Sequence, residues 1–358
     1  MLGRGIDQIL PCPSDPILYE DYVKSAMDYV HLAERAHGPI PRPSPYDYVW
    51  GDLLDHLGEV QPDARIINLE TSVTTSDTPA PKGINYRMHP ANIGCLTAAG
   101  VDCCVLANNH VLDWGVTGLV ETFEALERAG IRTAGGGRND IEASRPAVLD
   151  RPDERRFLVH GVGSTSSGIP PKWQAGERRP GVNLLRDLSG ATADRLSQEI
   201  LSERRPGDIV VVSIHWGANW GYDVPPEQRA FAHALIDAGA CDVLHGHSSH
   251  HPRPIEVYRD RLILYGCGDF LNDYEGISGY EQYRGDLTLM YLPRLAADGR
   301  LLELTLAPFR IRRFRLQRAV REDVEWMGST LDRECRPLGC RITPDAGHQL
   351  TVRWGSSA

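Results

Sequence analysis

The chain has 358 residues, enough for one large α/β domain or two ordinary ones, and its 41% hydrophobic residues and 35 glycines are typical of a globular protein. No stretch reaches the roughly 18 consecutive apolar residues that cross a bilayer, and no basic segment with an apolar core opens the chain, so we expect a cytoplasmic protein. A net charge of −10 argues against a nucleic-acid partner.

Apolar periodicity predicts the elements in chain order. Helices are expected over residues 18–37, 47–58, 89–100, 116–129 and 192–204. Strands are expected over residues 65–70, 101–107, 131–134, 157–162, 209–214, 243–244, 286–292 and 301–309, with a hairpin of 255–258 and 262–265. Residues 71–82 are interpreted as an exposed, mobile loop, and the residues after 334 as an irregular tail.

Side chains that can bind a metal stand at the ends of four predicted strands. They are Glu70, Asn109 with His110, His215, and His247 with His250. The carboxyl ends of strands in open α/β sheets form the edge where ligands collect, so we expect these groups to share one site. A single strand-end histidine is more often a structural residue that bonds a carbonyl group, but recurrence at four strands favours a metal site.

The combination of imidazole, amide and carboxylate groups indicates which ions would bind. A site with mixed nitrogen and oxygen ligands suits Zn, Mn, Fe or Ni better than Ca. It is also distinct from a site built of cysteine thiolates. Two such ions about 4 Å apart can clamp the attacking and leaving oxygens of a phosphoryl transfer. We therefore expect divalent transition metals as the cofactor, two per chain.

The segments around these residues resemble a known family. Five of them are similar, in order and spacing, to motifs of the CapA proteins. The CapA proteins are poly-γ-glutamate capsule biosynthesis proteins and a branch of the calcineurin-like metallophosphoesterases. The five segments are Asn68-Leu69-Glu70, Ala107-Asn108-Asn109-His110, His215-Trp216-Gly217, Gly246-His247-Ser248-Ser249-His250 and Gly266–Asp273. The resemblance implies an α/β fold of the metallophosphoesterase type, a four-layer sandwich with two mixed β-sheets flanked by helices. The CapA-like domain would span residues 1–310, followed by a C-terminal helix and an irregular tail over 311–358.

The same resemblance implies metal ligands. Glu70 would bridge the two ions, and Asn109, His215 and His247 would bind the second ion. His250 would belong to the first ion. In the family, a strand and a Gly-Asp pair usually precede the Met-Leu-Gly-Arg segment, and that Asp binds the first ion. This sequence opens at that segment, so we expect either a start further upstream or an incomplete first site.

Three further residues receive roles from the resemblance. His110 would be the general acid for the leaving group, since an imidazole titrates near neutral pH. Alternatively, His110 only orients the turn that carries Asn109. Arg4 and Arg87 are candidate substrate-binding residues for an anion in the cleft. A salt bridge or solvent exposure is the alternative for Arg4.

The expected function is a metal-dependent hydrolysis of phosphoester or related bonds, linked to poly-γ-glutamate or capsule biosynthesis, on a small-molecule or polymer substrate. One alternative is a non-catalytic accessory component of polymer synthesis or export, with membrane-bound capsule synthesis proteins as partners. Another is a metal-dependent amide or peptide hydrolase, because the metal chemistry does not by itself select phosphorus.

Overall fold

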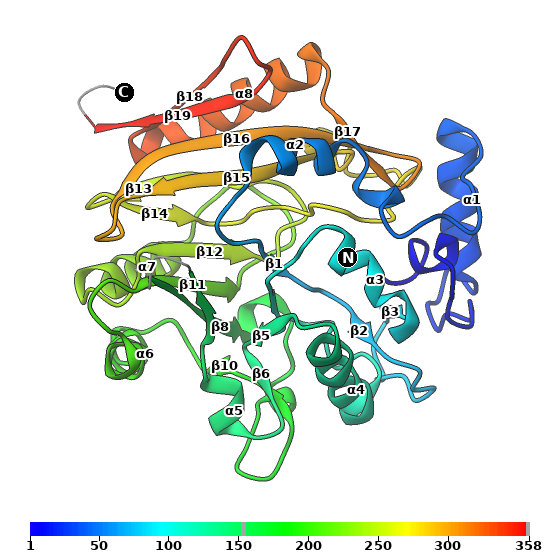
Figure 1. Cartoon of the computed structure of the whole chain (residues 1–358), viewed down its shortest axis with the longest axis horizontal. Coiled ribbons are helices and arrows are strands. Elements are labelled where there is room, and N and C mark those ends of the chain that lie inside the picture. The colour runs from blue at the N-terminus through cyan, green and yellow to red at the C-terminus, as the bar shows by residue number, and fades with distance from the viewer. Residues whose placement is uncertain (152–154, 356–358) are drawn as a thin grey trace.

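The computed structural model describes residues 1–151 and 155–355, and it shows a mixed α/β fold (Figure 1). This confirms the predicted class. The α-helices in the described residues are α1 (Ala26–His37), α2 (Asp52–Val60), α3 (Gly94–Ala98), α4 (Gly115–Arg128), α5 (Asp140–Ser144), α6 (Gly190–Glu203), α7 (Pro226–Asp237) and α8 (Arg321–Cys335).

A seven-stranded sheet carries the histidine-rich segment. Its order is β10-β8-β11-β12-β14-β13, with β7 beside β8, and only β7 and β13 run antiparallel to their neighbours. Helices α6 and α7 cover one face (Figure 1), which explains why β11 is buried along its whole length and reads as a continuous apolar run. The strands are β7 (Ala147–Asp150), β8 (Arg156–Ser164), β10 (Leu184–Leu185), β11 (Ile209–His215), β12 (Val243–His247), β13 (Ile255–Tyr258) and β14 (Arg261–Leu264).

A second, parallel sheet has the order β1-β4-β5. Its apolar side chains join the same core as those of β8, β11 and β12, so this sheet packs with the seven-stranded sheet. Two small pairs, β2-β3 and β6-β9, lie outside these sheets. The strands are β1 (Ile66–Asn68), β4 (Cys103–Val105), β5 (Arg132–Ala134), β2 (Ser72–Val73), β3 (Arg87–Met88), β6 (Gly136–Gly137) and β9 (Gly181–Val182).

The C-terminal part forms an antiparallel sheet of order β15-β16-β19-β18, with β17 beside β16. The expectation of an irregular tail is therefore wrong: two strands follow residue 334, and α8 packs on their apolar side chains. Residue 310, the expected domain boundary, falls inside β16. The strands are β15 (Leu287–Leu295), β16 (Leu301–Arg312), β17 (Arg315–Arg318), β18 (Cys340–Pro344) and β19 (Leu350–Trp354).

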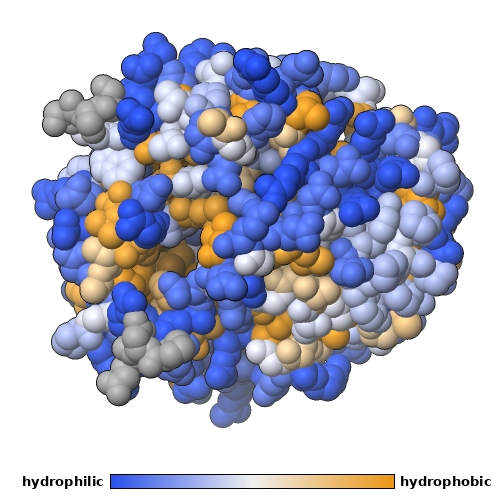
Figure 2. Space-filling model, turned by 45° about the horizontal axis from the view of Figure 1, so that its top comes forward, coloured by the Kyte–Doolittle hydropathy of each residue, from blue (hydrophilic) through white to orange (hydrophobic). Residues whose placement is uncertain are grey.

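The sheet arrangement differs from the expected pair of mixed sheets. Of the three larger sheets in the described part of the chain, one is parallel, one is mixed and one is antiparallel. No helix in residues 1–151 and 155–355 is long and apolar enough to cross a membrane. Figure 2 shows one face covered mainly by hydrophilic residues, with a hydrophobic hollow at its left side.

Two local expectations are also corrected. The predicted helix over 18–37 begins only at Ala26, because the Ser25 hydroxyl caps it by accepting a hydrogen bond from the backbone N–H of Met27. The loop over 71–82 is not exposed throughout, since Thr71, Ser72 and Thr74 are buried and β2 pairs with β3. This loop is therefore held against the rest of the fold.

Candidate functional site

The strand ends meet as the sequence predicted. In the parallel sheet, Asn68 at the end of β1 pairs with Val105 at the end of β4. In the seven-stranded sheet, His215 at the end of β11 pairs with His247 at the end of β12. A contact of 3.2 Å between Oδ1 of Asn109 and Nε2 of His215 links the carboxyl ends of the two sheets.

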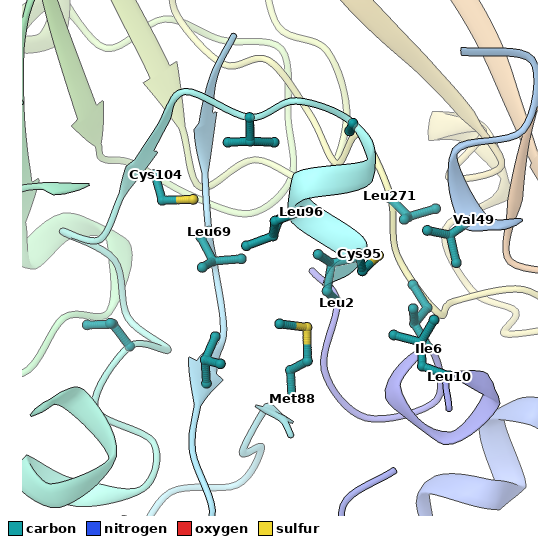
Figure 3. Packing of buried hydrophobic residues seen from close by; sticks show 14 of the residues in the cluster. Leu2, Ile6, Leu10, Val49, Leu69, Met88, Cys95, Leu96, Cys104 and Leu271 are labelled. Carbon is teal, nitrogen blue, oxygen red and sulfur yellow. The ribbon is translucent and has the colours of Figure 1, made fainter. Parts of the chain in front are cut away.

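Glu70 is directed into this site by its neighbour Leu69. The Leu69 side chain is buried in the hydrophobic cluster of Figure 3, near Leu96, and its backbone N–H donates to the carbonyl of Val105. Successive side chains of an extended segment point to opposite sides, so anchoring Leu69 in the core turns Glu70 toward the other side. Oε2 of Glu70 accepts a hydrogen bond of 3.0 Å from Nδ2 of Asn68.

The Glu70 carboxylate lies between two histidines. Its Oε1 is 4.0 Å from Nε2 of His110 and 4.0 Å from Nε2 of His215. Burial would raise the pKa of Glu70, but positive charge on His215, His110 and His250 acts in the opposite direction and lowers it to about 2. Glu70 is therefore a carboxylate at neutral pH.

His110 is oriented by a buried aspartate. Its Nδ1 is 2.7 Å from Oδ2 of Asp113, which leaves Nε2 facing Glu70. Nζ of Lys82 lies 2.7 Å from the other Asp113 oxygen and 2.5 Å from the carbonyl oxygen of Asn109. The His110 ring also packs against the Tyr86 ring, with centroids 4.1 Å apart. Burial lowers the pKa of His110 below its ordinary value, although Asp113 opposes this.

His215 and His247 are hydrogen-bonded to each other. Their Nδ1 atoms are 2.7 Å apart, and Nε2 of His247 is 3.0 Å from the hydroxyl of Ser213. Both rings are buried, with His215 fully shielded from solvent. Both nitrogens of His247 thus have protein partners in this structure, and its role as a metal ligand stays a prediction.

His250 belongs to a neighbouring pair. Its Nδ1 lies 3.1 Å from both carboxylate oxygens of Asp269, which also accepts a hydrogen bond from Asn272. Burial lowers the pKa of His250, but the Asp269 carboxylate outweighs this and the pKa is raised. Rings of Trp220 and Tyr274 border His250.

Arg4 lies in a buried network of ion pairs. The residue is 3% exposed, and its guanidinium donates two hydrogen bonds to Asp273, one to Glu20 and one to the hydroxyl of Tyr29. These are the partners of a buried salt bridge, which was the alternative for this residue. A substrate-binding role for Arg4 stays a prediction.

Arg87 lies on β3, and its guanidinium donates to the carbonyl oxygens of Ser76 and Asp15 and stacks over the Trp114 ring. The described contacts of this side chain do not join it to Glu70 or the histidines, so its substrate role stays a prediction.

The ligand atoms of Glu70, Asn109 and His215 are of the kinds that one transition-metal ion binds, but the distances between them match such a site only approximately. Two donors bound to one ion at about 2.1 Å lie about 3.4 Å apart in tetrahedral geometry, which the 3.2 Å contact between Asn109 and His215 approaches. The 4.0 Å separation of Glu70 and His215 is longer. No three His, Cys, Asp or Glu side chains in the described ranges are close enough to hold an ion by themselves. An ion here would depend on the amide oxygen of Asn109.

Several residues of the site were missed from the sequence. Asp113 stands three positions after His110, a spacing that could have indicated a partner within one turn. Asp269 lies within the Gly266–Asp273 segment that resembles the family, but no role was given to it. Lys82 comes from the loop interpreted as mobile, and no local pattern pointed to its position beside Asp113.

Comparison with known proteins gives the family. Residues 1–274 match the family described as "Bacterial capsule synthesis protein PGA_cap". The chain belongs to this family. It is 48% identical, over 98% of its length and 93% of the relative, to a probable polyglutamine synthesis accessory protein of Mycobacterium tuberculosis.

More distant relatives include the "Capsule biosynthesis protein CapA" of Bacillus anthracis and the "PGA biosynthesis protein CapA" of Bacillus subtilis. The first is 30% identical over 54% of this chain and 46% of the relative. The second is 28% identical over 65% of this chain and 58% of the relative. The predicted CapA resemblance is thereby confirmed.

Proposed function

We propose that this PGA_cap protein acts in the synthesis of poly-γ-glutamate or a related capsule polymer, and that its strand-end site hydrolyses a phosphoester or related bond. The names of its relatives support the first part. One observation carries the second part: Oε1 of Glu70 lies 4.0 Å from Nε2 of both His110 and His215, at the carboxyl ends of parallel strands in two sheets.

Glu70, Asn109 and His215 would hold a divalent transition-metal ion. When bound, such an ion supplies Lewis-acid polarisation of a phosphoryl or carbonyl oxygen. Glu70 contributes a negative charge that is already present at neutral pH, and Asn109 contributes a neutral oxygen. The second expected ion has less support, because His247 and His250 are hydrogen-bonded to protein partners.

His110 would donate a proton to the leaving group, which requires the imidazolium form that Asp113 favours and burial disfavours. Asp113 accepts a hydrogen bond from Nδ1 and so fixes the ring with Nε2 toward Glu70. A protonated Nε2 at this position donates to the oxygen or nitrogen that leaves, and Asp113 stabilises the imidazolium form. The same geometry accepts an amide in place of a phosphoester, so γ-glutamyl amides belong among the test substrates.

Hydrolysis is tested with the purified full-length protein, Mn²⁺ and bis(p-nitrophenyl) phosphate. We expect turnover by the wild type and a loss of about 100-fold or more in His215→Ala. His31→Ala, on the exposed face of α1, is the matched control and keeps wild-type turnover. A wild type inactive on phosphoesters and γ-glutamyl amides, or an unchanged His215→Ala, would refute the hydrolase proposal.

The accessory alternative is tested in the source organism. Deletion of the gene is expected to lower the amount of γ-linked glutamate polymer, and the wild-type gene is expected to restore it. Complementation with His215→Ala separates the two proposals. Full restoration by this variant would favour a non-catalytic role, whereas no restoration favours hydrolysis. Unchanged polymer in the deletion strain contradicts any role in its synthesis.

A further inference from the structure

Ser213 and His245 form a layer behind the two strand-end histidines. Ser213 lies two residues before His215 on β11, and His245 lies two residues before His247 on β12. Side chains two residues apart on a strand share a face, and Ser213 pairs directly with His245 in the sheet. The four side chains therefore occupy two successive rungs on one face.

The Ser213 hydroxyl connects these rungs. Its Oγ is 2.9 Å from Nδ1 of His245 and 3.0 Å from Nε2 of His247. Nδ1 of His247 is in turn 2.7 Å from Nδ1 of His215, and Nε2 of His215 is 3.2 Å from Oδ1 of Asn109. Ser213 is fully buried and His247 is 4% exposed, so water does not compete strongly for these bonds.

We propose that Ser213, supported by His245, is a positioning residue of the site, because it holds His247 through Nε2 and keeps Nδ1 directed toward His215. A histidine at a metal or catalytic site is oriented by the hydrogen bond of its other ring nitrogen. This inference rests on the proposed function for the use of the site, but the contacts themselves do not depend on it.

A hydroxyl is suited to this place because it both donates and accepts. Oδ1 of Asn109 only accepts, so Nε2 of His215 carries the proton when it bonds Asn109. Nδ1 of His215 then accepts from His247, His247 accepts from Ser213, and Ser213 accepts from His245. The reverse order also satisfies the groups from His215 to His245, but it removes the proton that Nε2 of His215 donates to Asn109, so we expect the first order in the metal-free protein. Ser213 supports either order, whereas alanine supports neither.

The test uses the full-length protein without added metal, labelled with ¹⁵N in its histidines. In the wild type at pH 7.5, we expect the ring nitrogens of His247 to show one dominant tautomer by NMR. Ser213→Ala leaves Nε2 of His247 without its partner and is expected to shift and broaden the signal of this nitrogen, and Ser213→Thr, which keeps the hydroxyl, is expected to restore the wild-type signal. His245→Asn keeps an N–H near the position of Nδ1 and is expected to perturb the pattern less than His245→Leu.

A second readout is the binding of Mn²⁺, which we expect Ser213→Ala to weaken about 10- to 100-fold and Ser213→Thr to retain. Ser249→Ala is the matched control, since this buried serine donates to the His251 carbonyl and to no imidazole nitrogen. Unchanged ring signals of His247 in Ser213→Ala would overturn the inference. It would also be overturned if Ser213→Thr did not recover the wild-type signals and His245→Leu left them unchanged. A wild type that binds no Mn²⁺ but shows the expected NMR changes would refute the metal proposal alone.

Discussion

Oδ2 of Asp113 lies 2.7 Å from Nδ1 of His110, and the same oxygen accepts a hydrogen bond of 2.7 Å from the backbone N–H of Tyr86. The other carboxylate oxygen accepts from Lys82. The loop between Glu70 and Tyr86 is thus fastened to the turn that carries His110. Asp113 is fully buried, so this carboxylate fixes both the ring and the loop.

Asp113→Asn is expected to lower kcat on bis(p-nitrophenyl) phosphate by about 10²- to 10⁴-fold. The amide cannot accept at both positions, so the ring of His110 loses its fixed tautomer while the side-chain volume is kept. Steady-state kinetics with circular dichroism checks the result. Asp298→Asn, in the exposed turn after β15, is the control for a lost carboxylate. Wild-type kcat in Asp113→Asn would show that His110 does not need this partner.

Arg4→Met is expected to lower the free energy of unfolding by about 3–5 kcal/mol, because it leaves the Glu20 and Asp273 carboxylates buried without their partner. Urea denaturation measures the change. Arg300→Met removes an exposed pair and is expected to leave the unfolding midpoint unchanged. A similarly small effect of Arg4→Met would contradict the structural role given to this residue.

The stability of the fold is expected to fall on acidification through buried neutral histidines such as His160 on β8. Burial lowers the pKa of His160 from 6.5 to about 4, and its Nε2 has no partner in the described residues. Below pH 6.5 the unfolded chain takes up a proton at His160 that the folded chain does not. The contribution of neutral His160 to the free energy of unfolding is therefore complete above pH 6.5 and is lost as the pH falls toward 4.

His160→Leu removes this titration. The difference in unfolding free energy between pH 7.5 and pH 4 is then expected to shrink by about 3 kcal/mol, the equivalent of about 2.5 pKa units. Urea denaturation at several pH values measures it. Equal pH slopes for the variant and the wild type would show that His160 does not titrate in this range.

The sequence predicted regular, locally determined features well. The spacing of Leu119, Phe123 and Leu126 predicted a helix over 116–129, and α4 spans Gly115–Arg128. The apolar run before His215 predicted a strand over 209–214, and β11 ends one residue later. Strand ends also predicted the convergence of Glu70, Asn109 and His215, because parallel strands share an edge.

Contacts between distant segments could not be predicted in this way. Arg4 binds Asp273, which is 269 residues away, and only the folded chain shows that this pairing buries the guanidinium. Strands β18 and β19 were missed because each has only five residues, too few for a clear alternation of apolar and polar side chains. Cys340 and Ile342 alternate inward, but the flanking polar residues hide this pattern.

The most direct measurement is an isothermal titration of the full-length protein with Mn²⁺, for the wild type and Glu70→Gln. This substitution keeps the shape of the side chain and removes the negative charge that lies 4.0 Å from His215. We predict saturable binding by the wild type and a loss of at least about tenfold in affinity for Glu70→Gln. No binding by the wild type, or equal binding by both proteins, would contradict a metal-dependent site at Glu70.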